Sequence, residues 1–377
     1  MKIMTILGTR PEIIRLSRII PLLDKAAEHV LVHTGQNYDT RLNELFFDEL
    51  RVRRPDESMS VRAMGPAAQI GQILEQSERL FLKHRPDRVL VLGDTNSGMA
   101  AIVARRLGIP VYHMEAGNRC YDDRVPEEVN RRVIDHCSTV LMPYTERSRA
   151  NLLREGVAGD RVYVIGNPIK EVIDAFEPEI GASRILESLG LDARGYFLVT
   201  MHRAENVDIE SRLRSLVEAL RRLHHVFGRP VICSFHPRTR SKVESFGVDV
   251  ASPGLRFVEP FGFFDFIRLE QQAFCTLSDS GTVQEEACIF KVPNVTIRDV
   301  TERPETVECG SNYLSGAGPD EIVRGVELVT SAPPRWTPPI EYLADDVAAT
   351  VCRLVTGYRM PDLAETAWRE RWLSDRT

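Results

Sequence analysis

Acidic side chains follow several short apolar runs of this chain, which is where catalytic groups of α/β proteins gather. Asp94 comes just after the run 88–92, Glu115 comes just after the run 110–114, and Glu127 stands in the first turn of an expected helix. Carboxyl groups that lie close together raise one another's pKa, so one can hold a proton while another is ionised. Moving a proton from one face of a carbon to the other requires such a group. We interpret Asp94, Glu115 and Glu127 as acid–base candidates.

The helix expected over residues 125–135 also permits a simpler interpretation. Acids in a first helical turn are favoured by the helix dipole, whatever their chemistry, and this is our preferred interpretation of Glu128. Arg131 lies one turn further on and supplies positive charge beside the acids, which suits an anionic ligand.

A second group of residues indicates an anion site. Ser280, Gly281 and Thr282 form a small-residue turn between an apolar run and a helix, and the N–H groups and dipole of such a turn attract phosphate. Glu286, a turn further in, is placed to accept a hydrogen bond from a ribose hydroxyl. Arg303 belongs to a charged segment that suits phosphate or carboxylate pairing. The alternative is an ordinary capped helix with acids in its first turns.

Histidine and arginine recur at the ends of other expected strands. His202 and Arg203 follow one apolar run, and His236 follows the next. A single histidine at a strand end is usually a satisfied structural residue, but two with arginines nearby favour an anionic ligand. Arg10, in Gly8–Glu12, stands at the start of the first helix, which is expected to continue through residue 23. The single glycine of that segment cannot wrap a pyrophosphate as a dinucleotide-binding loop does.

Alternating strand and helix patterns must position these residues. Strands are expected over residues 3–7, 30–32, 88–92, 110–114, 140–142 and 162–165, and, in a second run, over 196–200, 231–235, 256–258, 274–277 and 294–297. Such alternation predicts an α/β chain with parallel sheets covered by helices on both faces. We expect two doubly wound Rossmann-like domains facing a cleft, one over residues 1–167 and one over 168–354, with a helix near 355–377 packing back on the first.

Composition limits the classes of partner. The chain has 377 residues and a formal net charge of −6, which argues against nucleic acid or an anionic membrane as the main partner. No apolar run approaches the ~20 residues of a membrane span. The seven cysteines are an odd number without a C-x-x-C pair, which favours reduced thiols in a cytoplasmic enzyme and argues against a zinc site.

Several motifs, taken in order, resemble those of the non-hydrolysing UDP-N-acetylglucosamine 2-epimerases. They are GTRPE, GDT, HMEAG, PEEVNR, HR, DSG-x-x-QEE and RD-x-TERPE, and they span roughly residues 1–310. The resemblance implies a glycosyltransferase-B type fold and inversion at C2 of a UDP-2-acetamido sugar, with neither NAD nor metal. In the family, UDP is eliminated to give an enzyme-bound 2-acetamidoglucal and then adds again after protonation from the opposite face.

Carried onto this chain, the resemblance assigns acid–base work to Asp94, Glu115 and Glu127. It assigns stabilisation of the departing UDP to His202 and Arg10, and binding of the phosphate and ribose to Ser280, Gly281 and Glu286. Relatives are usually homodimers, so a homodimer is expected.

Two features depart from the best-known members. A Gln-His pair that contributes to a regulatory UDP-sugar site in several of them is Gln36-Asn37 here, and Arg15 replaces a lysine. Segments such as GTRPEIIRLS and HMEAGNRC look more like a branch that converts UDP-2-acetamido-2,6-dideoxy-L-talose into UDP-N-acetyl-L-fucosamine. The sequence therefore leaves open this 6-deoxy substrate, and a glycosyltransferase on the same scaffold as a further alternative.

Overall fold

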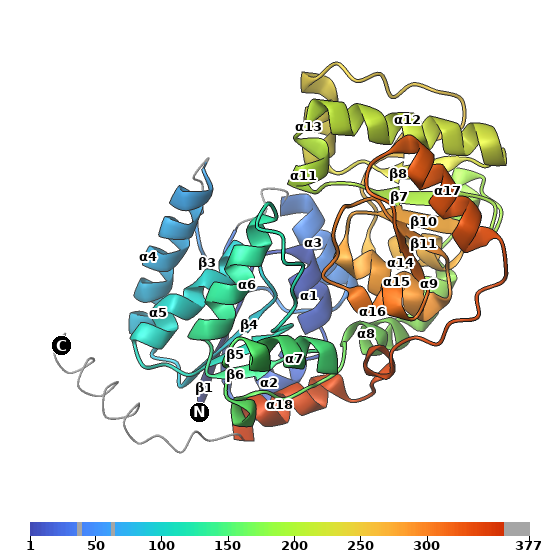
Figure 1. Ribbon diagram of the computed structural model, residues 1–377. Helices are drawn as coiled ribbons and strands as arrows, with labels where there is room; N and C mark the ends of the chain where they lie inside the picture. The colour runs from blue at the N-terminus through green and yellow to red at the C-terminus, as the bar shows by residue number, and fades with distance from the viewer. Residues whose placement is uncertain (36–39, 62–64, 358–377) are drawn as a thin grey trace. The chain divides into compact units, whose positions relative to one another are not determined.

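The computed structural model describes residues 1–35, 40–61 and 65–357, and they form two compact units (Figure 1). The first unit comprises Met1–Ile173 together with the chain from Ala344 onward, and the second comprises Asp174–Leu343. The first unit thus runs six residues past the boundary expected at 167, and the chain returns to it at 344 instead of near 355. Gln36-Asn37 and the part of the expected C-terminal helix beyond residue 357 lie outside the described residues.

The first unit contains a six-stranded parallel sheet in the order β3-β2-β1-β4-β5-β6. Its strands are β1 (Lys2–Leu7), β2 (Glu28–His33), β3 (Glu57–Ser58), β4 (Arg88–Leu92), β5 (Val111–Met114) and β6 (Val140–Met142). The strand order reverses between β1 and β4, the place where doubly wound sheets bind ligands at the carboxyl ends of their strands.

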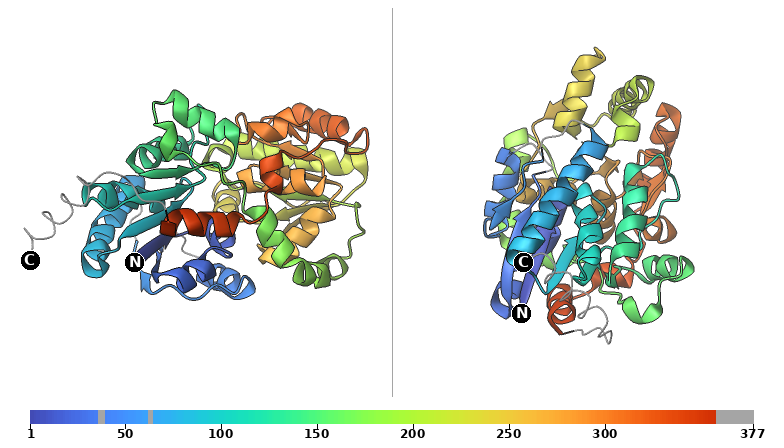
Figure 2. Two further views of the ribbon diagram at one scale, coloured as in Figure 1. Left: turned by 90° about the horizontal axis from the view of Figure 1, so that it is seen from below. Right: turned by 90° about the vertical axis from the view of Figure 1, so that its left-hand side faces the viewer.

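Helices cover both faces of this sheet. They are α1 (Arg10–Leu16), α2 (Ile20–Ala26), α3 (Thr40–Glu49), α4 (Pro66–His84), α5 (Ala100–Arg106), α6 (Pro126–Cys137), α7 (Glu146–Arg154), α8 (Ile169–Ala175) and α18 (Val347–Gly357), with single 3₁₀ turns at Asn96–Met99 and Gly159–Arg161. In Figure 2, α18 lies beside the N-terminal elements, where it packs against α2. Arg88 at the start of β4 donates a hydrogen bond to the carbonyl of Val355 and so ties α18 to the sheet.

Two details of the first unit differ from the sequence prediction. The expected continuous helix after Gly8 is broken into α1 and α2, because Pro21 has no N–H to continue the ladder and instead starts a new helix. The strand expected over 162–165 is reduced to an isolated bridge between Leu141 and Val162.

The second unit repeats the same topology, with a parallel sheet in the order β12-β11-β10-β7-β8-β9. Its strands are β7 (Phe197–Thr200), β8 (Val231–Ser234), β9 (Leu255–Val258), β10 (Cys275–Ser278), β11 (Asn294–Thr296) and β12 (Asn312–Leu314). Numbered from the first strand of each unit, both sheets read 3-2-1-4-5-6. Here the reversal lies between β7 and β10.

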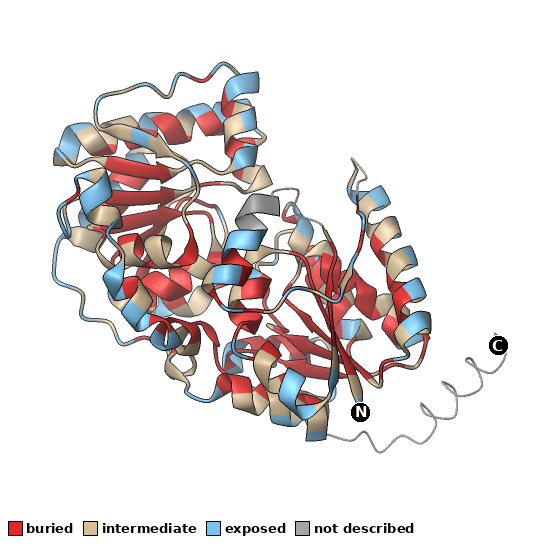
Figure 3. Cartoon of the chain, turned by 180° about the vertical axis from the view of Figure 1, so that it is seen from behind, coloured by how far each residue is buried: buried red, intermediate tan, exposed pale blue. Residues whose placement is uncertain are grey.

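The helices of the second unit are α9 (Glu177–Ala182), α10 (Ile185–Leu189), α11 (Ala204–Val207), α12 (Glu210–Phe227), α13 (Pro237–Ser245), α14 (Phe263–Gln271), α15 (Gly281–Phe290), α16 (Pro304–Glu308) and α17 (Pro319–Thr330), followed by a 3₁₀ turn at Ile340–Leu343. In each unit the central strands are buried along their length while the outer faces of the helices are exposed (Figure 3). Strands buried on both faces explain the nearly continuous apolar runs in the sequence.

Among the described residues, no helix combines the length and the apolar character needed to cross a membrane.

Candidate active site

Asp94 and Glu115 lie at the carboxyl ends of neighbouring strands of the first unit. Strands β4 and β5 pair in parallel, with Leu92 opposite Met114, so the residues that follow them share one edge of the sheet. Glu115 has a positive φ of 64°, a conformation that costs energy for a residue with a Cβ. The structure therefore brings together two of the three acids that the sequence pattern selected.

The Asp94 carboxylate is fixed from one side by Arg131 of α6. Its Oδ2 oxygen accepts a hydrogen bond from Arg131 Nε at 2.8 Å and lies 2.7 Å from Arg131 Nη2. Its Oδ1 oxygen has no hydrogen-bond partner among the described residues, and the side chain is 24% exposed. Asp94 is thus oriented through one oxygen, which leaves the other available to a ligand.

Glu115 is held by a buried arginine that the sequence analysis treated only as a replacement for lysine. Arg15 Nη1 donates to Glu115 Oε2 at 2.9 Å, and the Arg15 guanidinium also lies over the ring of Tyr144. Asn118 donates to the other carboxylate oxygen at 3.2 Å. The planar guanidinium, stacked on an aromatic ring, holds the carboxylate in one orientation.

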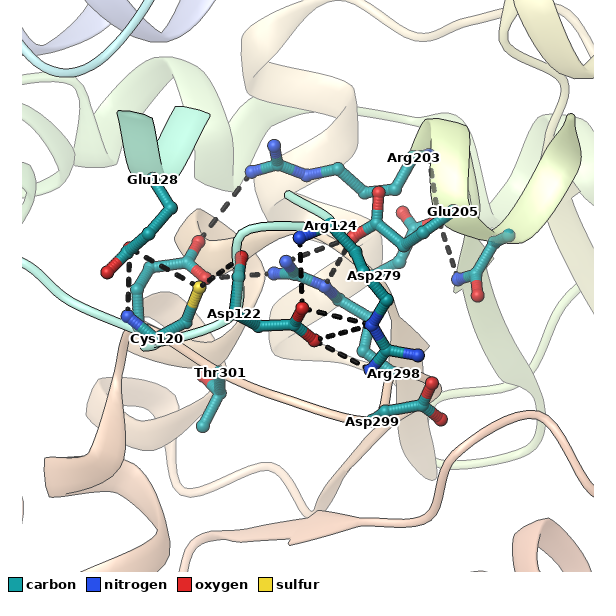
Figure 4. Close-up of polar contacts among 12 residues, drawn as sticks. Cys120, Asp122, Arg124, Glu128, Arg203, Glu205, Asp279, Arg298, Asp299 and Thr301 are labelled. Carbon is teal, nitrogen blue, oxygen red and sulfur yellow. Dashed lines mark hydrogen bonds and ion pairs between the residues drawn. The ribbon is translucent and has the colours of Figure 1, made fainter. Parts of the chain in front are cut away.

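The two acids at the start of α6 have different surroundings. Glu128 is fully buried and accepts hydrogen bonds from the amides of Cys120 and Tyr121 and from Arg131, as Figure 4 shows for Cys120. Burial alone would raise the pKa of Glu128, but these hydrogen bonds outweigh it and hold the pKa below its usual value. Glu128 therefore holds the loop at Cys120 and Tyr121 in place, in addition to the helix-dipole role expected for it. Glu127, by contrast, is only half-buried.

The segment Gly8–Glu12 closes on itself through a capping box. The Glu12 carboxylate accepts hydrogen bonds from the amides of Gly8 and Thr9, at 2.5 Å and 2.7 Å, and from the Thr95 hydroxyl at 2.7 Å. Burial raises the pKa of Glu12 to about 7, although each of these hydrogen bonds lowers it. Arg10 occupies the first position of α1, with its guanidinium 5.9 Å from the centre of the Phe46 ring.

In the second unit, Asp279 organises the loop after β7. This fully buried carboxylate accepts hydrogen bonds from the amides of His202 and Arg203, at 2.9 Å each, and from the side chain of Asn206 at 3.1 Å. Its Oδ1 also lies 3.2 Å from His202 Nδ1. Asp279 thereby connects the end of β10 to the loop that carries His202, a role that the sequence analysis did not predict.

The two predicted histidines meet in the structure. The ring centroids of His202 and His236 are 5.2 Å apart. His236 also has a structural task, since its Nδ1 accepts a hydrogen bond from the amide of Arg238 and caps α13. Its other ring nitrogen then carries the hydrogen and is a donor.

Helix α15 begins where the anion site was predicted. Ser280 is its N-cap residue, but no side chain caps the helix; the Ser280 hydroxyl contacts that of Thr282 at 3.0 Å. A Cβ on Gly281 would lie 2.8 Å from Glu302 Oε1, so a larger residue there would require the Glu302 side chain to shift. Small residues and an N-terminus without a side-chain cap are the features of a phosphate site.

A network of ion pairs packs against the first turns of α15, and Figure 4 shows part of it. Arg298 pairs with Glu205 at 3.0 Å and with Glu302 at 2.9 Å, while Arg303 pairs with Glu285 of α15. Arg303 is 5% exposed. The structure therefore places the predicted phosphate ligand Arg303 in a buried pair that supports α15.

Glu286 stands beside a second acid that the sequence analysis did not select. Glu270 of α14 is fully buried, and neither of its carboxyl oxygens has a hydrogen-bond partner that meets normal geometry among the described residues. Burial raises the pKa of Glu270 well above its usual value, and the neighbouring Glu286 raises it further. The raised pKa keeps Glu270 neutral beside Glu286, so the two acids do not place two negative charges side by side.

Two doubly wound parallel units of identical strand order, each with polar side chains where the order reverses, define a protein of the glycosyltransferase-B fold class. The fold alone is shared with the glycosyltransferase WaaG of lipopolysaccharide biosynthesis, which has a TM-score of 0.59 at 12% identity over 94% of this chain and 100% of that one.

Sequence comparison identifies the family. A family profile described as UDP-N-acetylglucosamine 2-epimerase matches residues 23–355. The chain is 40% identical over 348 residues to the UDP-N-acetylglucosamine 2-epimerase of Methanocaldococcus jannaschii, covering 90% of this chain and 95% of the relative. It is 38% identical over 329 residues to the UDP-2,3-diacetamido-2,3-dideoxy-D-glucuronate 2-epimerase of Pseudomonas aeruginosa, covering 86% and 90%.

Solved structures agree with this result. The UDP-GlcNAc 2-epimerase of M. jannaschii in complex with UDP-GlcNAc and UDP has a TM-score of 0.89 at 38% identity, over 94% of this chain and 99% of that one. The UDP-N-acetylglucosamine 2-epimerase of Rickettsia bellii has a TM-score of 0.88 at 40% identity, over 95% and 96%. The chain belongs to the UDP-N-acetylglucosamine 2-epimerase family.

Proposed function

We propose that this protein is a non-hydrolysing UDP-2-acetamido-sugar 2-epimerase, with UDP-N-acetylglucosamine and UDP-N-acetylmannosamine as its substrate pair. The observation that carries the proposal is the pair of oriented acids, Asp94 and Glu115, at the carboxyl ends of the neighbouring strands β4 and β5. Membership of the family and the complex of a relative with UDP-GlcNAc and UDP support the choice of sugar nucleotide. A glycosyltransferase needs an acceptor site and has no use for two acids that exchange a proton with C2.

The proposal assigns the UDP moiety to residues of the second unit. The start of α15, with Ser280, Gly281 and Thr282, supplies N–H groups and the positive helix end for phosphate, and Glu286 accepts from the ribose. His202 and His236 supply donors for charge on the leaving diphosphate, and Arg203 and Arg10 supply positive charge.

The acids of the first unit exchange the proton at C2. One of Asp94, Glu115 and Glu127 removes the proton, and the C1–O bond breaks with its electron pair leaving on UDP, so a double bond forms between C1 and C2. An acid on the opposite face then returns a proton to C2 while UDP bonds again to C1. Arg131 and Arg15 hold the Asp94 and Glu115 carboxylates in fixed orientations, which avoids the entropic cost of ordering them during the reaction.

The sugar is tested with a panel of purified nucleotides and no acceptor. Proton NMR follows UDP-N-acetylglucosamine, the 2,3-diacetamido-glucuronate nucleotide named for the P. aeruginosa relative, and the 6-deoxy-L-talose nucleotide. The proposal expects the highest kcat/KM for UDP-N-acetylglucosamine, with the 2-epimer as the only new sugar nucleotide. Release of free UDP, or turnover of none of the three, would contradict it.

We also propose that the enzyme acts as a cytoplasmic homodimer. The resemblance to dimeric relatives supports the assembly, and the absence of a disulfide among the cysteines, all of which the structure describes, suits a reducing compartment. Light scattering of the purified protein should report about twice the chain mass of 42.6 kDa. A mass of one chain at micromolar concentration would contradict the dimer.

A further inference from the structure

A buried histidine lies beneath the two acids of the first unit. His113 is on β5, two residues before Glu115, and is 1% exposed. Its Nε2 lies 2.8 Å from the carbonyl oxygen of Gly93, the residue before Asp94. Its Nδ1 lies 2.9 Å from Oδ1 of Asp135, a buried carboxylate on α6. One imidazole ring therefore connects β4, β5 and α6.

The Asp135 carboxylate extends this connection to the loop after Glu115. Its Oδ2 accepts a hydrogen bond from the amide of Gly117 at 3.2 Å and lies 2.8 Å from Arg119 Nη2. Arg119 is in turn paired with Glu155 at 2.6 Å. Burial on its own would raise the pKa of Asp135, but the His113 and Arg119 contacts outweigh it and hold the pKa below its usual value.

Both nitrogens of the His113 ring face hydrogen-bond acceptors. A backbone carbonyl only accepts, so Nε2 must be the donor to Gly93. An ionised carboxylate also only accepts, so Nδ1 satisfies it only when it too carries a hydrogen. The ion pairs then form a chain, His113–Asp135–Arg119–Glu155, in which His113 and Arg119 carry positive charge and Asp135 and Glu155 carry negative charge. They balance, which is the condition for burying such a cluster.

At its Gly93 end, this chain of hydrogen bonds lies next to Asp94 and Glu115. Gly93 has a φ of 72°, and a Cβ placed on it would lie 3.8 Å from Glu115 Oε2. The Gly93 carbonyl thus fixes a peptide that leads directly into Asp94 and passes close to the Glu115 carboxylate. Neither His113 nor Asp135 is placed to touch the substrate itself.

We propose that His113, doubly protonated and paired with Asp135, is a positioning residue that fixes Asp94 and Glu115 relative to each other. This inference rests on the proposed function, in which those two acids exchange the proton at C2. A displacement of about 1 Å in a reacting group can cost about 10²-fold in rate. The hydrogen bond to the Gly93 carbonyl opposes such a displacement.

Graded replacements of His113 test the proposal. His113→Leu removes both hydrogen bonds and should lower kcat about 10²-fold, with the affinity for UDP unchanged within about twofold. His113→Gln still reaches the Gly93 carbonyl through its amide and should recover part of that loss. A folded His113→Leu enzyme with kcat within threefold of the wild type would overturn the proposal, as would a parallel loss of UDP affinity.

Thr139→Val is the matched structural control. Thr139 is buried in the same unit, and its hydroxyl accepts a hydrogen bond from the amide of Val111 at the opposite end of β5 from the acids. The control should lose stability while keeping kcat. If it loses kcat as strongly as His113→Leu at the same loss of stability, the effect is general destabilisation and the positioning role is overturned.

The protonation state provides a test that does not depend on activity. In wild-type enzyme with ¹⁵N-labelled histidine, both ring nitrogens of His113 should show attached hydrogens at pH 7, with the signal assigned by its absence from His113→Gln. One unprotonated ring nitrogen would overturn the inference. Absence of epimerase activity in the wild type would instead contradict the proposed function, so the two failures are distinguishable.

Discussion

At the scale of single residues, glutamate side chains take four different roles in this protein because their partners differ. Glu128 is held ionised by two amides and an arginine, and Glu12 closes a capping box at a neutral pKa. Glu270 is kept protonated by burial beside another acid. Glu115, held by Arg15, lies at the end of a strand, and the proposed function assigns it a role in proton transfer. Residue type alone does not separate these roles.

Glu12 should make stability depend on pH. Its pKa is raised from 4.5 to about 7 by burial, so between these values the folded protein keeps a proton that the unfolded chain has released. The unfolded state then binds fewer protons, and stability falls as pH rises through this window. Between pH 4 and pH 8 the free energy of unfolding, relative to Glu12→Gln, should fall by about 3 kcal/mol.

Urea unfolding of the wild type and of Glu12→Gln at several pH values measures this difference. Glutamine keeps the shape of the side chain and does not titrate, so it removes only the contribution of this residue. A difference that stays constant from pH 4 to pH 8, or grows with pH, would contradict a raised pKa for Glu12 in the folded protein.

Cys309 should be the most reactive thiol of the second unit. Its sulfur lies 3.7 Å from that of Cys288, and the hydrogen bond from Cys288 lowers the pKa of Cys309 to about 6. Cys309 is half-buried, so a reagent can reach it, whereas burial raises the pKa of the equally half-buried Cys137. Iodoacetamide at pH 7 should therefore label Cys309 well before Cys137.

Mass spectrometry of the labelled peptides ranks the thiols. Cys288→Ala removes the hydrogen bond and should slow the labelling of Cys309 while leaving that of Cys137 unchanged. Equal labelling rates for Cys309 and Cys137 in the wild type would contradict the assignment.

The roles of single residues were predictable only where they follow from position along the chain. Asp94 and Glu115 could be selected because each directly follows an apolar run. Asp279 and Asp135 could not, because their partners are distant in sequence: His202 lies 77 residues from Asp279, and His113 lies 22 residues from Asp135. A local pattern contains no information about which loop such a carboxylate will meet in space.

At the scale of elements, the loops after the strands are fixed by close backbone packing. Gly117, in the loop after β5, has a φ of 81°, and a Cβ there would lie 2.3 Å from the carbonyl oxygen of Ser148 on α7. The side chain of Asn151 also donates to the Gly117 carbonyl. This contact joins the loop that follows Glu115 to α7.

Gly117→Ala should therefore destabilise the protein by more than 3 kcal/mol, because a strained backbone conformation and overpacking against α7 add together. Gly156→Ala is the matched control, since Gly156 has a φ of 85° but nothing within 4 Å of its Cβ position. The control should cost only about 1–2 kcal/mol, the strain alone. Equal shifts in the urea midpoint for the two variants would contradict the packing argument.

The sequence predicted the helices and strands that are long enough to show periodicity. Helix α6 and the central strands β1, β4 and β10 lie within a few residues of their expected places. Strands β3 (Glu-Ser) and β12 (Asn-Tyr-Leu) were not predicted because neither is an apolar run, whereas the equally short edge strand β6 (Val-Leu-Met) is one and was predicted. The break between α1 and α2 was also missed, although Pro21 marks it.

At the scale of the whole molecule, the two units share one topology, and the proposed function assigns proton transfer to the first unit and UDP binding to the second. The alternating pattern was enough to predict two doubly wound domains, because parallel sheets need a helix between successive strands. A C-terminal helix packing back on the first unit was expected near residues 355–377, but α18 already begins at Val347. Its return to the first unit depends on contacts of α18 with α2 and of Val355 with Arg88, which involve residues far apart in the sequence.

This division of labour predicts that turnover and nucleotide binding can be separated. Asp94→Asn keeps the shape of the side chain but removes the charge that pairs with Arg131 and the capacity to take a proton. The variant should lose at least about 10³-fold in kcat and keep its affinity for UDP within about threefold, measured by calorimetry. Ser280→Pro, which alters the start of α15, should show the opposite result, a loss of UDP affinity. Loss of UDP affinity in Asp94→Asn would contradict the division.

The measurement that tests the account most directly is the fate of the C2 hydrogen. Enzyme and UDP-N-acetylglucosamine are incubated in D₂O without an acceptor, and the products are observed by NMR and mass spectrometry. The account predicts UDP-N-acetylmannosamine with deuterium at C2, and no such exchange with Asp94→Asn. An epimer that retains its original hydrogen at C2, or deuterium exchange that proceeds unchanged in Asp94→Asn, would contradict proton transfer by these acids.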